Sequence, residues 1–469
     1  MTDANPDPIP APDLEGKANG LRAPVVVAGA GPAGALMAIY LARQGHEVTV
    51  YESRPDLRRT DIDAGRSINL ALATRGIVPL VDVGVIDRVD AITIPMRGRM
   101  IHAVDDPTPD LQPYGSKEHE VIHSVSRSDL NAILLDAAEA TGRVTIEFER
   151  RLDAIDFDAS ELTFTDGSTA PFGVIVGADG AGSPVRDAIA AAGDGDHHTD
   201  WLDHSYKELT LPPNDDGGHR LEPNALHIWP RGEFMLIALA NPEGDFTVTL
   251  FAPNETFAEL STVPAVDAFF AREFPDFVPL VPDLAQQYQE NPTGALGTLR
   301  ATGWSHRDRA VLVGDSAHAI VPFHGQGMNA AMESARALDR HLRASPDDVA
   351  AAFRNYEAER KPDGDAIADM ALGNYIEMRA GVVDPDYLAK RALALELEQR
   401  HPTQLSPRYN MVMFSTMPYA EAKARAERQA DLIAAAIADP SVDVDALVDS
   451  LPPLPTLDPL ADPKALSTS

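Results

Sequence analysis

The sequence predicts a mixed α/β fold, and three stretches of the chain carry this prediction. Residues 25–52 read as a strand, a glycine turn, a helix and a second strand, which is the pattern of a parallel α/β unit. Residues 201–299 alternate apolar stretches with Asn, Pro and Gly turns, a pattern typical of antiparallel strands. After Pro362 the chain is rich in alanine and reads as helical to about Ala438. At 469 residues the chain is too long for one hydrophobic core, which stops growing at about 250 to 300 residues, so we expect two or three lobes.

The first of these stretches contains a GxGxxG motif in the setting that dinucleotide binding requires. Gly29 permits the sharp turn, Gly31 lets backbone approach a pyrophosphate, and Gly34 lets the helix pack against the strand. The free N–H groups at the start of the helix favour an anion there. Glu52 ends the second strand, where a carboxylate can accept hydrogen bonds from both ribose hydroxyls of an adenosine. Residues 25–52 therefore predict an adenine dinucleotide site of unspecified kind.

Composition argues against several classes of partner. The formal net charge is −33, from 39 basic and 72 acidic residues, so binding to nucleic acid or an anionic membrane is not expected. The absence of cysteine excludes disulfides, thiolate metal sites and a thiol nucleophile. Residues 25–42 approach the length of a membrane span, but their glycine turn favours a buried strand and helix. Residues 1–21 resemble a disordered leader and lack the features of a signal peptide, and we expect a cytoplasmic protein.

The segments after Glu52 alternate loops, helices and strands. A basic loop at residues 54–59 precedes a polar loop that contains Arg66 and an amphipathic helix near residue 80. Ser126 or Ser128 can cap the next helix, and Arg127 at its start can reach a second phosphate or a ribose. Residues 144–177 then read as several strands, the last of them buried.

Two later turns repeat the style of the first unit. The turn 177–180 contains Asp179 and follows a buried strand, and Gly314-Asp315 does the same ahead of Pro322 and the loop 325–327. Each turn alone is an ordinary β-turn or a capping aspartate. Together with GAGPAG they resemble the single-component FAD-dependent aromatic hydroxylases, in which the segments GADGAGSPVR and GDSAHAIVPFHGQGMN lie near the pyrophosphate and the flavin.

The resemblance narrows in segments outside the dinucleotide motifs. GRSINLAL (65–72), IPMRGRMIH (94–102), PYG (113–115), SVSR (124–127), EPNALHIWPR (222–231), AHAIVPFHGQGMN (317–329) and NYIEMR (374–379) resemble the kynurenine 3-monooxygenase family, in order and across most of the chain. The resemblance implies that bound FAD is reduced by NADPH, captures O₂ as a C4a-hydroperoxide and transfers oxygen to the aromatic ring of kynurenine. No catalytic side chain is then expected, because the cofactor does the difficult step.

The same resemblance assigns the cofactor residues. It implies FAD contacts from Gly29, Gly31, Pro32, Ala33, Gly34, Glu52, Arg66, Arg127, Asp179, Gly314, Asp315, Pro322, Gly325, Gly327, Met328 and Asn329. Asp315 would bond the ribityl chain, and the helix start near Gly327 would face the pyrimidine side of the flavin. Only one GxGxxG occurs, so NADPH is expected to bind transiently in a surface groove, with basic help from Arg54, Arg58 or Arg59.

The resemblance also implies the substrate residues. Arg99 and Tyr114 would hold the amino-acid carboxylate of kynurenine, with help from Asn374 and Tyr409; a guanidinium fork binds a carboxylate bidentately. From the residues alone, Arg97 has a similar claim to that of Arg99. The aromatic pocket would be lined by Leu226, Ile228, Phe234, Ile237, Pro322, Phe323 and His324, most of which are equally good core residues. We expect no metal site.

These assignments complete the predicted architecture. We expect a Rossmann-type FAD-binding domain of the glutathione-reductase-like kind, with an inserted antiparallel β-sheet substrate domain and a C-terminal helical region. The expected boundaries are residues 22–90, 120–200 and 296–372 for the FAD-binding domain, 91–119 and 201–295 for the substrate domain, 373–450 for the helical region, and 451–469 for a flexible tail.

Two other functions stay open at this point. A related flavin hydroxylase acting on a substituted kynurenine or another anthranoyl-type aromatic acid would have the same fold and flavin site. A non-enzymatic Rossmann-fold binding protein, similar to the dissociation inhibitors of prenylated GTPases, would keep the glycine turn, although the Gly314-Asp315 turn speaks against it. The oligomeric state is also open, with a homodimer as one option, as is the choice between NADPH and NADH.

Overall fold

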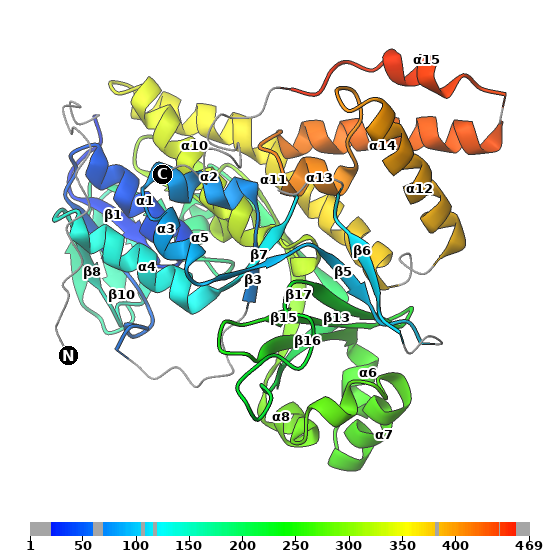
Figure 1. Cartoon of the computed structure of the whole chain (residues 1–469). Coiled ribbons are helices and arrows are strands. Elements are labelled where there is room, and N and C mark those ends of the chain that lie inside the picture. Colours follow the sequence, from blue (N-terminus) through cyan, green and yellow to red (C-terminus); the bar gives the residue numbers. More distant parts are fainter. Residues whose placement is uncertain are drawn as a thin grey trace.

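The computed structural model describes residues 20–59, 69–104, 108–115, 120–379, 384–439 and 441–455. Figure 1 shows two sheets side by side, with helices α12, α14 and α15 at one end of the molecule and α6, α7 and α8 at the opposite end. The mixed α/β class predicted from the sequence is confirmed. Arg66, which the family resemblance assigned to FAD, lies outside the described residues.

The first sheet has six strands in the order β18-β19-β12-β1-β2-β8. Its strands are β1 (Val25–Ala28), β2 (Val48–Tyr51), β8 (Val144–Glu147), β12 (Val174–Gly177), β18 (Ser305–His306) and β19 (Ala310–Leu312). All neighbouring pairs are parallel except β18 and β19. β1, β12 and β19 are buried along their whole length, as expected for apolar strands that are covered on both faces.

Three of the helices in this part of the molecule pack together. α1 (Pro32–Arg43) packs against α4 (Arg127–Ala140) and α10 (Gly327–Ala344). α4 begins at the predicted cap, because the Ser126 hydroxyl accepts a hydrogen bond from the backbone N–H of Asp129. Three shorter helices belong to this part: α2 (Thr74–Asp82), α3 (Ile86–Asp90) and α5 (Pro184–Ala191). One small sheet consists of β3 (Asn69–Leu72), β7 (Ile122–Ser126) and β4 (Thr93–Met96). A second small sheet consists of β11 (Thr169–Pro171), β10 (Glu161–Phe164) and β9 (Leu152–Asp156).

The second sheet has seven strands in the order β17-β13-β16-β15-β14-β5-β6. They are β5 (Gly98–Ile101), β6 (Asp110–Pro113), β13 (Asp196–Leu211), β14 (Leu226–Pro230), β15 (Met235–Ala240), β16 (Phe246–Pro253) and β17 (Thr293–Thr302). Every neighbouring pair is antiparallel except β14 and β5, so the antiparallel sheet predicted from the alternating pattern is confirmed. In Figure 1 the early strands β5 and β6 extend this otherwise green sheet.

One part of the predicted sheet region is helical. α6 (Asn254–Glu259), α7 (Val263–Glu273), the 3₁₀ turn η1 (Val278–Leu280) and α8 (Leu284–Glu290) lie between β16 and β17. Their aromatic side chains, Phe269, Phe270, Phe274 and Phe277, are buried against one face of the seven-stranded sheet. The reading of residues 201–299 as strands alone was therefore incomplete, because aromatic residues suit a strand and a packed helix equally well.

The C-terminal part is helical from an earlier point than predicted. α11 runs from Val349 to Arg379 and includes Pro362 in its interior, whereas the sequence suggested that the helices begin after this proline. The remaining elements are α9 (Asp315–His318), the 3₁₀ turn η2 (Pro322–His324), α12 (Pro385–Arg400), α13 (Arg408–Met413), α14 (Tyr419–Ala438) and α15 (Val444–Asp449). Among the described residues, no helix combines the length and hydropathy of a membrane span.

Candidate functional site

Three glycine turns that are far apart in the sequence meet at one edge of the six-stranded sheet. Gly29 has a φ of +94°, and a Cβ there would lie 2.4 Å from the carbonyl oxygen of Ala178. A Cβ on Gly314, whose φ is +69°, would lie 3.3 Å from the Cβ of Ala33. The turn of the opening motif therefore contacts both later turns, and the close approach depends on glycine at each position.

The opening turn has the geometry of an anion cradle. Gly31 is the N-terminal cap of α1 in extended conformation. Apart from its two chain neighbours, no atom of the described residues lies within 4 Å of the position that its Cβ would take. A Cβ on Gly34 would lie 2.0 Å from the carbonyl oxygen of Gly29, so helix and turn are in direct contact. Pro32 occupies the first turn of the helix, where its missing N–H costs nothing. Open space at Gly31 beside free helix N–H groups fits a pyrophosphate.

Glu52 lies at the tip of β2 and is buried. Its Oε2 accepts a hydrogen bond of 2.8 Å from the N–H of Ala30, and its Oε1 accepts one of 2.9 Å from the N–H of Arg54. Burial raises the pKa of Glu52, but these bonds and the Arg54 guanidinium outweigh burial and hold the pKa below its ordinary value. The carboxylate is therefore charged and oriented beside the glycine turn.

Asp179 follows β12, Asp315 follows β19 and Arg127 begins α4. Asp179 Oδ2 accepts a hydrogen bond from the N–H of Val185, while its buried Oδ1 has no partner among the described residues. Burial raises the pKa of Asp179 to about 6, against the hydrogen bonds that it accepts. Asp315 and Arg127 both have accessible side chains. Desolvation by the surrounding protein raises the pKa of Asp315 and the guanidinium of Arg127 opposes that rise, so the Arg127 charge lies near the Asp315 carboxyl.

The loop after η2 leads into the start of α10. Gly325 has a φ of +64°, and Gly327 opens a helix of 18 residues whose first N–H groups are free to meet an acceptor. The Asn329 side chain is occupied, because it accepts from the N–H of Ala73 at 2.9 Å and donates to the carbonyl of Gly325 at 2.8 Å. The Asn329 side chain therefore holds the loop against the end of β3, and only the backbone of Asn329 is left to contact a cofactor. Met328 is half-buried beside it.

The polar residues assigned to the substrate come together in a second site. The rings of Tyr114 and Tyr409 stack with centroids 5.0 Å apart, and the ring of His324 stacks on the same Tyr409 at 5.4 Å. The guanidinium carbon of Arg99 lies 4.8 Å from the Tyr409 ring centroid. Arg99 is buried whereas Arg97 is exposed, so the structure separates the two arginines that composition could not.

Several buried polar atoms in this site have no hydrogen-bond partner among the described residues. They include Arg99 Nε, Asn374 Oδ1, the Tyr114 hydroxyl and both ring nitrogens of His324. Burial, assisted by Arg408 and Arg99, lowers the pKa of His324 to about 3, so its ring is neutral. Buried polar groups are almost always hydrogen-bonded, so several unpartnered groups in one site indicate a polar ligand.

Glu377 on α11 is a site residue that the sequence reasoning missed. Its carboxylate accepts hydrogen bonds from Arg99 Nη1 at 3.0 Å, Arg408 Nη2 at 2.9 Å and the Tyr387 hydroxyl at 2.7 Å. Burial raises the pKa of Glu377, but the two guanidiniums outweigh it and bring the pKa down to about 2. Two cations thus surround one carboxylate, and the polar end of the pocket keeps a net positive charge. The segment NYIEMR held the only signal, an acid between family-like residues.

Most of the apolar residues predicted to line the pocket lie together in the structure, with one exception. Leu226, Ile228 and Phe323 are buried in one cluster with Tyr114, and Ile237 packs against it. Phe323 stacks on Tyr375 with centroids 3.8 Å apart, while Pro322 is exposed at the start of the loop. The prediction for Phe234 was wrong. This ring packs against Phe269, with centroids 5.3 Å apart, on the other face of the sheet, because successive strand residues alternate between faces.

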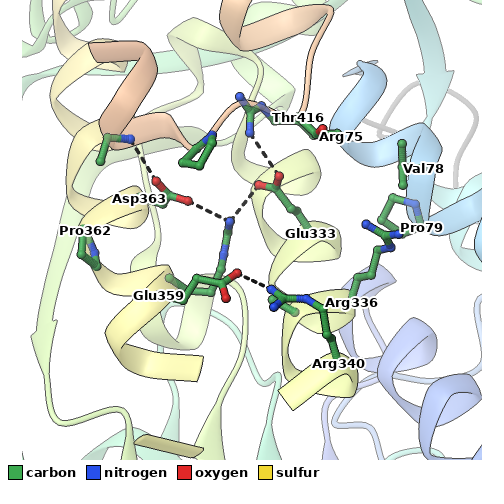
Figure 2. Close-up of a pocket in the computed structure, with 14 residues that line it drawn as sticks. Arg75, Val78, Pro79, Glu333, Arg336, Arg340, Glu359, Pro362, Asp363 and Thr416 are labelled. Carbon is green, nitrogen blue, oxygen red and sulfur yellow. Dashed lines mark hydrogen bonds and ion pairs between the residues drawn. The ribbon is translucent and has the colours of Figure 1, made fainter. Parts of the chain in front are cut away.

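A separate cavity of about 390 Å³ lies between α2, α10, α11 and α14. Figure 2 shows its ion pairs, in which Glu333 lies between two guanidiniums. Glu333 accepts from Arg75 at 3.1 Å and from Arg360 at 2.8 Å. Arg75 also donates to the carbonyl of Val412 at 2.9 Å, which ties α13 and therefore Tyr409 to the flavin half of the molecule. The cavity is thus part of the support of the substrate site.

Of the three arginines considered for NADPH, one is fully engaged. Arg58 binds Asp56, Asp136 and Glu139 at 2.9, 3.0 and 2.6 Å. Arg54 pairs with Glu52, and Arg59 is largely exposed. In the part of the chain that the structure describes, no three His, Cys, Asp or Glu side chains are grouped to hold a metal ion.

Comparison with known proteins agrees with this geometry. Residues 22–371 match the FAD binding domain family. Kynurenine 3-monooxygenase of Stenotrophomonas maltophilia (strain K279a) is 51% identical over 418 residues, which cover 87% of this chain and 91% of that protein. Kynurenine 3-monooxygenase of Xanthomonas campestris pv. campestris (strain 8004) is 49% identical over 413 residues, covering 86% of this chain and 90% of that protein.

Solved structures show the same fold at lower identity. The tetrameric form of 2-methyl-3-hydroxypyridine-5-carboxylic acid oxygenase aligns with a TM-score of 0.64 at 24% identity, over 78% of this chain and 94% of that chain. PqsL of P. aeruginosa, in complex with 2-aminobenzoylacetate, aligns with a TM-score of 0.63 at 21% identity, over 76% and 96% of the two chains. With three converging glycine turns that fit FAD and relatives that match along most of its length, the chain belongs to the FAD binding domain family and, within it, to the kynurenine 3-monooxygenases.

Proposed function

We propose that this chain hydroxylates L-kynurenine to 3-hydroxykynurenine as an FAD-dependent monooxygenase that consumes NADPH and O₂. The observation that carries the proposal is that the loop 322–327 connects the glycine cradle with the site around Arg99 and Tyr409. One side of this loop continues into the glycine cradle, and the other holds His324 beside a buried guanidinium with an unpartnered Nε. The kynurenine 3-monooxygenase relatives point to the same substrate.

The cradle residues have separate tasks toward FAD. Gly29, Gly31 and Gly34 with the start of α1 would hold the pyrophosphate, and Glu52 the adenosine ribose. Asp315 and the start of α10 would hold the flavin end, where helix N–H groups favour negative charge. When bound, FAD supplies the redox chemistry, because it takes electrons from NADPH and activates O₂.

The polar end of the pocket is suited to an amino acid. Arg99 and Arg408 outnumber the single carboxylate of Glu377, so a second carboxylate is attracted. The unpartnered Nε of Arg99 can donate to that carboxylate, and Asn374 Oδ1 can accept from an ammonium group. Kynurenine carries both groups on one carbon.

The apolar walls exclude water and fix the aromatic ring. Phe323 and Tyr375 form one stacked wall, and Leu226 and Ile237 come from the sheet opposite. His324 is uncharged at neutral pH and is a weak base, so it serves as a hydrogen-bonding wall and not as a general base. Holding the ring still beside the flavin loop is the contribution that the protein makes to the rate.

The test uses the purified holoprotein. Its absorbance spectrum reports bound flavin, and NADPH consumption with and without kynurenine is followed by mass analysis of the product. We expect flavin bands, stimulation by kynurenine and a product heavier by one oxygen. A colourless protein would favour the non-enzymatic binding protein. Stimulation by another aromatic acid but not by kynurenine would favour the related hydroxylase.

The domain division, oligomeric state and location stay predictions. We propose that residues 91–119 and 201–295 form one substrate domain; the pairing of β5 with β14 supports this grouping. Limited proteolysis of the holoprotein should then cut first near the domain boundaries. A homodimer is tested by light scattering after gel filtration, and a cytoplasmic location by cell fractionation.

A further inference from the structure

The side chain of Gln326 is completely buried, although this residue lies in the glycine loop 325–327 that leads into α10. An amide in the protein interior costs free energy unless both its oxygen and its N–H₂ group find partners. Gln326 Nε2 lies 2.9 Å from the sulfur of Met413, and Gln326 Oε1 lies 2.6 Å from the hydroxyl oxygen of Tyr419. Met413 ends α13 and Tyr419 begins α14, so the C-terminal helices hold the side chain of this loop residue.

The direction of both hydrogen bonds follows from which atoms can donate. A thioether sulfur carries no proton, so the N–H₂ group of Gln326 faces Met413 and donates to it. The amide oxygen then faces Tyr419 and can only accept, so the Tyr419 hydroxyl donates its single proton to Gln326 Oε1. Among the described residues, no other group donates to this oxygen. The Tyr419 hydroxyl is therefore what satisfies the buried amide oxygen of the loop.

Tyr419 is itself firmly placed. Its ring is fully buried, and the guanidinium carbon of Arg75 lies 3.9 Å from the ring centroid. Attraction between a guanidinium and the face of an aromatic ring favours this arrangement. Arg75 belongs to α2 and donates to the carbonyl of Val412 at 2.9 Å, so its own position is fixed as well. The ring of Tyr419 is thus held independently of the bond that its hydroxyl makes.

The loop is anchored to its surroundings at three separate points. Asn329 accepts from the N–H of Ala73 at 2.9 Å, at the end of β3. Asn374 on α11 donates to the carbonyl of Phe323 at 2.7 Å. The side chain of Gln326 supplies the third anchor, between the other two in the sequence. The anchors on either side therefore leave the position of the loop centre to Gln326.

Removal of the Tyr419 hydroxyl would raise the free energy of this one loop position. Phe at position 419 keeps the ring over Arg75 but offers no donor, so Gln326 Oε1 would be buried without a partner. That oxygen regains a hydrogen bond when Gln326 moves out and its amide meets water. The cost therefore shifts the population toward displaced positions of Gln326. The free N–H groups at the start of α10 move with its backbone.

We propose that Tyr419 is a positioning residue for the loop 325–327 and, through it, for the flavin end of FAD. Gln326 is the N-terminal cap of α10, so its position sets the direction of the first helix N–H groups, which we expect to face the flavin. The C-terminal helices thus complete the cofactor site as well as the substrate site. The effect on kynurenine turnover rests on the proposed function, whereas the effect on the loop requires only bound FAD.

The first test measures hydrogen exchange in the FAD-loaded holoprotein without substrate. The reporter is the N–H of Ala330, which donates to the carbonyl of Gln326 at 2.8 Å and exchanges when Gln326 leaves its position. In Tyr419→Phe, exchange in the peptide 322–330 should be about 5- to 30-fold faster, as expected for a buried amide oxygen that loses its partner.

Tyr40→Phe is the matched control for this measurement. Tyr40 is also buried, and its hydroxyl donates to Asp82 at 2.9 Å, on α1 and away from the loop. The control should leave exchange in the peptide 322–330 at the native rate. A rate in Tyr419→Phe no faster than that of the control would overturn the proposal, and so would an equal increase in the strands of the six-stranded sheet, which reports general loosening.

The second test is a rescue that distinguishes the lost bond from damage to α14. Gln326→Leu added to Tyr419→Phe removes both polar groups and leaves only a thioether, a weak acceptor, without a partner. Exchange in the double variant should therefore return to within about threefold of the native rate. A double variant as fast as Tyr419→Phe, or faster, would show that Tyr419 does not act through Gln326. If Tyr419→Phe does not fold, the same comparison is made between Gln326→Leu, which leaves the Tyr419 hydroxyl without an acceptor, and the double variant.

The third measurement is the ratio of hydroxylated product to NADPH consumed, with kynurenine present. A displaced loop admits water to the flavin, so more of the O₂ reduced by NADPH should leave as H₂O₂ and the ratio should fall in Tyr419→Phe. The ratio should recover in the double variant. A protein that is merely less stable has fewer active molecules but an unchanged ratio, so a native ratio in Tyr419→Phe would overturn the effect on the flavin. If kynurenine is not the substrate, the exchange rates alone decide the proposal.

Discussion

Replacement of Glu377 by Gln is the sharpest test of the electrostatics described above. The side chain is 18% exposed and accepts from Arg99, Arg408 and Tyr387. Gln has the same shape but no charge, and its amide N–H₂ faces donors where a carboxylate oxygen accepted. The variant therefore leaves two neighbouring guanidiniums without their common counter-ion.

The pKa of Glu377 gives the size of the effect. Lowering from the ordinary 4.5 to about 2 corresponds to about 3 kcal/mol of folding free energy, at about 1.4 kcal/mol per tenfold. Because the pKa is lower in the folded protein, this stabilisation is full above pH 4.5 and is lost as pH falls toward 2. The difference between native and Glu377→Gln protein should be about 3 kcal/mol at pH 7 and about 0.8 kcal/mol smaller at pH 4.

Urea unfolding of the FAD-loaded proteins, followed by tryptophan fluorescence at both pH values, measures these differences. Glu139→Gln is the matched control, since Glu139 also binds an arginine, Arg58 at 2.6 Å, but is 43% exposed. Its effect should stay below about 1 kcal/mol, as is usual for surface pairs. A Glu377→Gln difference as small as that of the control, or one that does not change with pH, would refute the reasoning.

Three further changes test other parts of the molecule. Gly34→Val should give a protein without flavin absorbance, because its Cβ would lie 2.0 Å from the Gly29 carbonyl oxygen; a yellow variant would contradict this. Arg99→Ala should raise the kynurenine KM by about 10- to 100-fold with flavin retained, while exposed Arg97→Ala changes it little; loss of flavin would mean that Arg99 belongs to the cofactor site. Glu333→Gln should lower the free energy of unfolding by about 2 to 4 kcal/mol in urea titrations, since its two arginine partners are buried; a change below about 1 kcal/mol would count against this support role.

The glycine turns could be predicted because their requirements are local. The conformation of Gly29 and the close contact at Gly34 depend on a few neighbouring residues and leave a spacing in the sequence. The serine cap of α4 is of the same kind. Asp179 and Asp315 were assigned to the same cofactor as the first turn by the family resemblance. In the structure they follow β12 and β19, whose carboxyl ends share one edge of the parallel sheet with β1.

The parts that were missed depend on tertiary contacts. Glu377 is significant only because α11, α12, α13 and β5 bring three donors to one carboxylate, and no spacing in the sequence records that convergence. Phe234 was placed on the wrong face because an isolated strand pattern does not say which face meets the pocket. Helices α6 to α8 were hidden by aromatic residues that suit either a strand or a packed helix.

The strand order of the six-stranded sheet also determines when, during synthesis of the chain, the FAD site can form. Val25 of β1 pairs with Val174 of β12, and Val176 pairs with Val311 of β19. A ribosome releases the first glycine turn long before the strand that completes the sheet, so the nascent chain carries unpaired apolar strand edges through much of translation. Capture of FAD is thus a late event, and free cofactor stabilises the folded chain by mass action at the moment when aggregation is the competing fate.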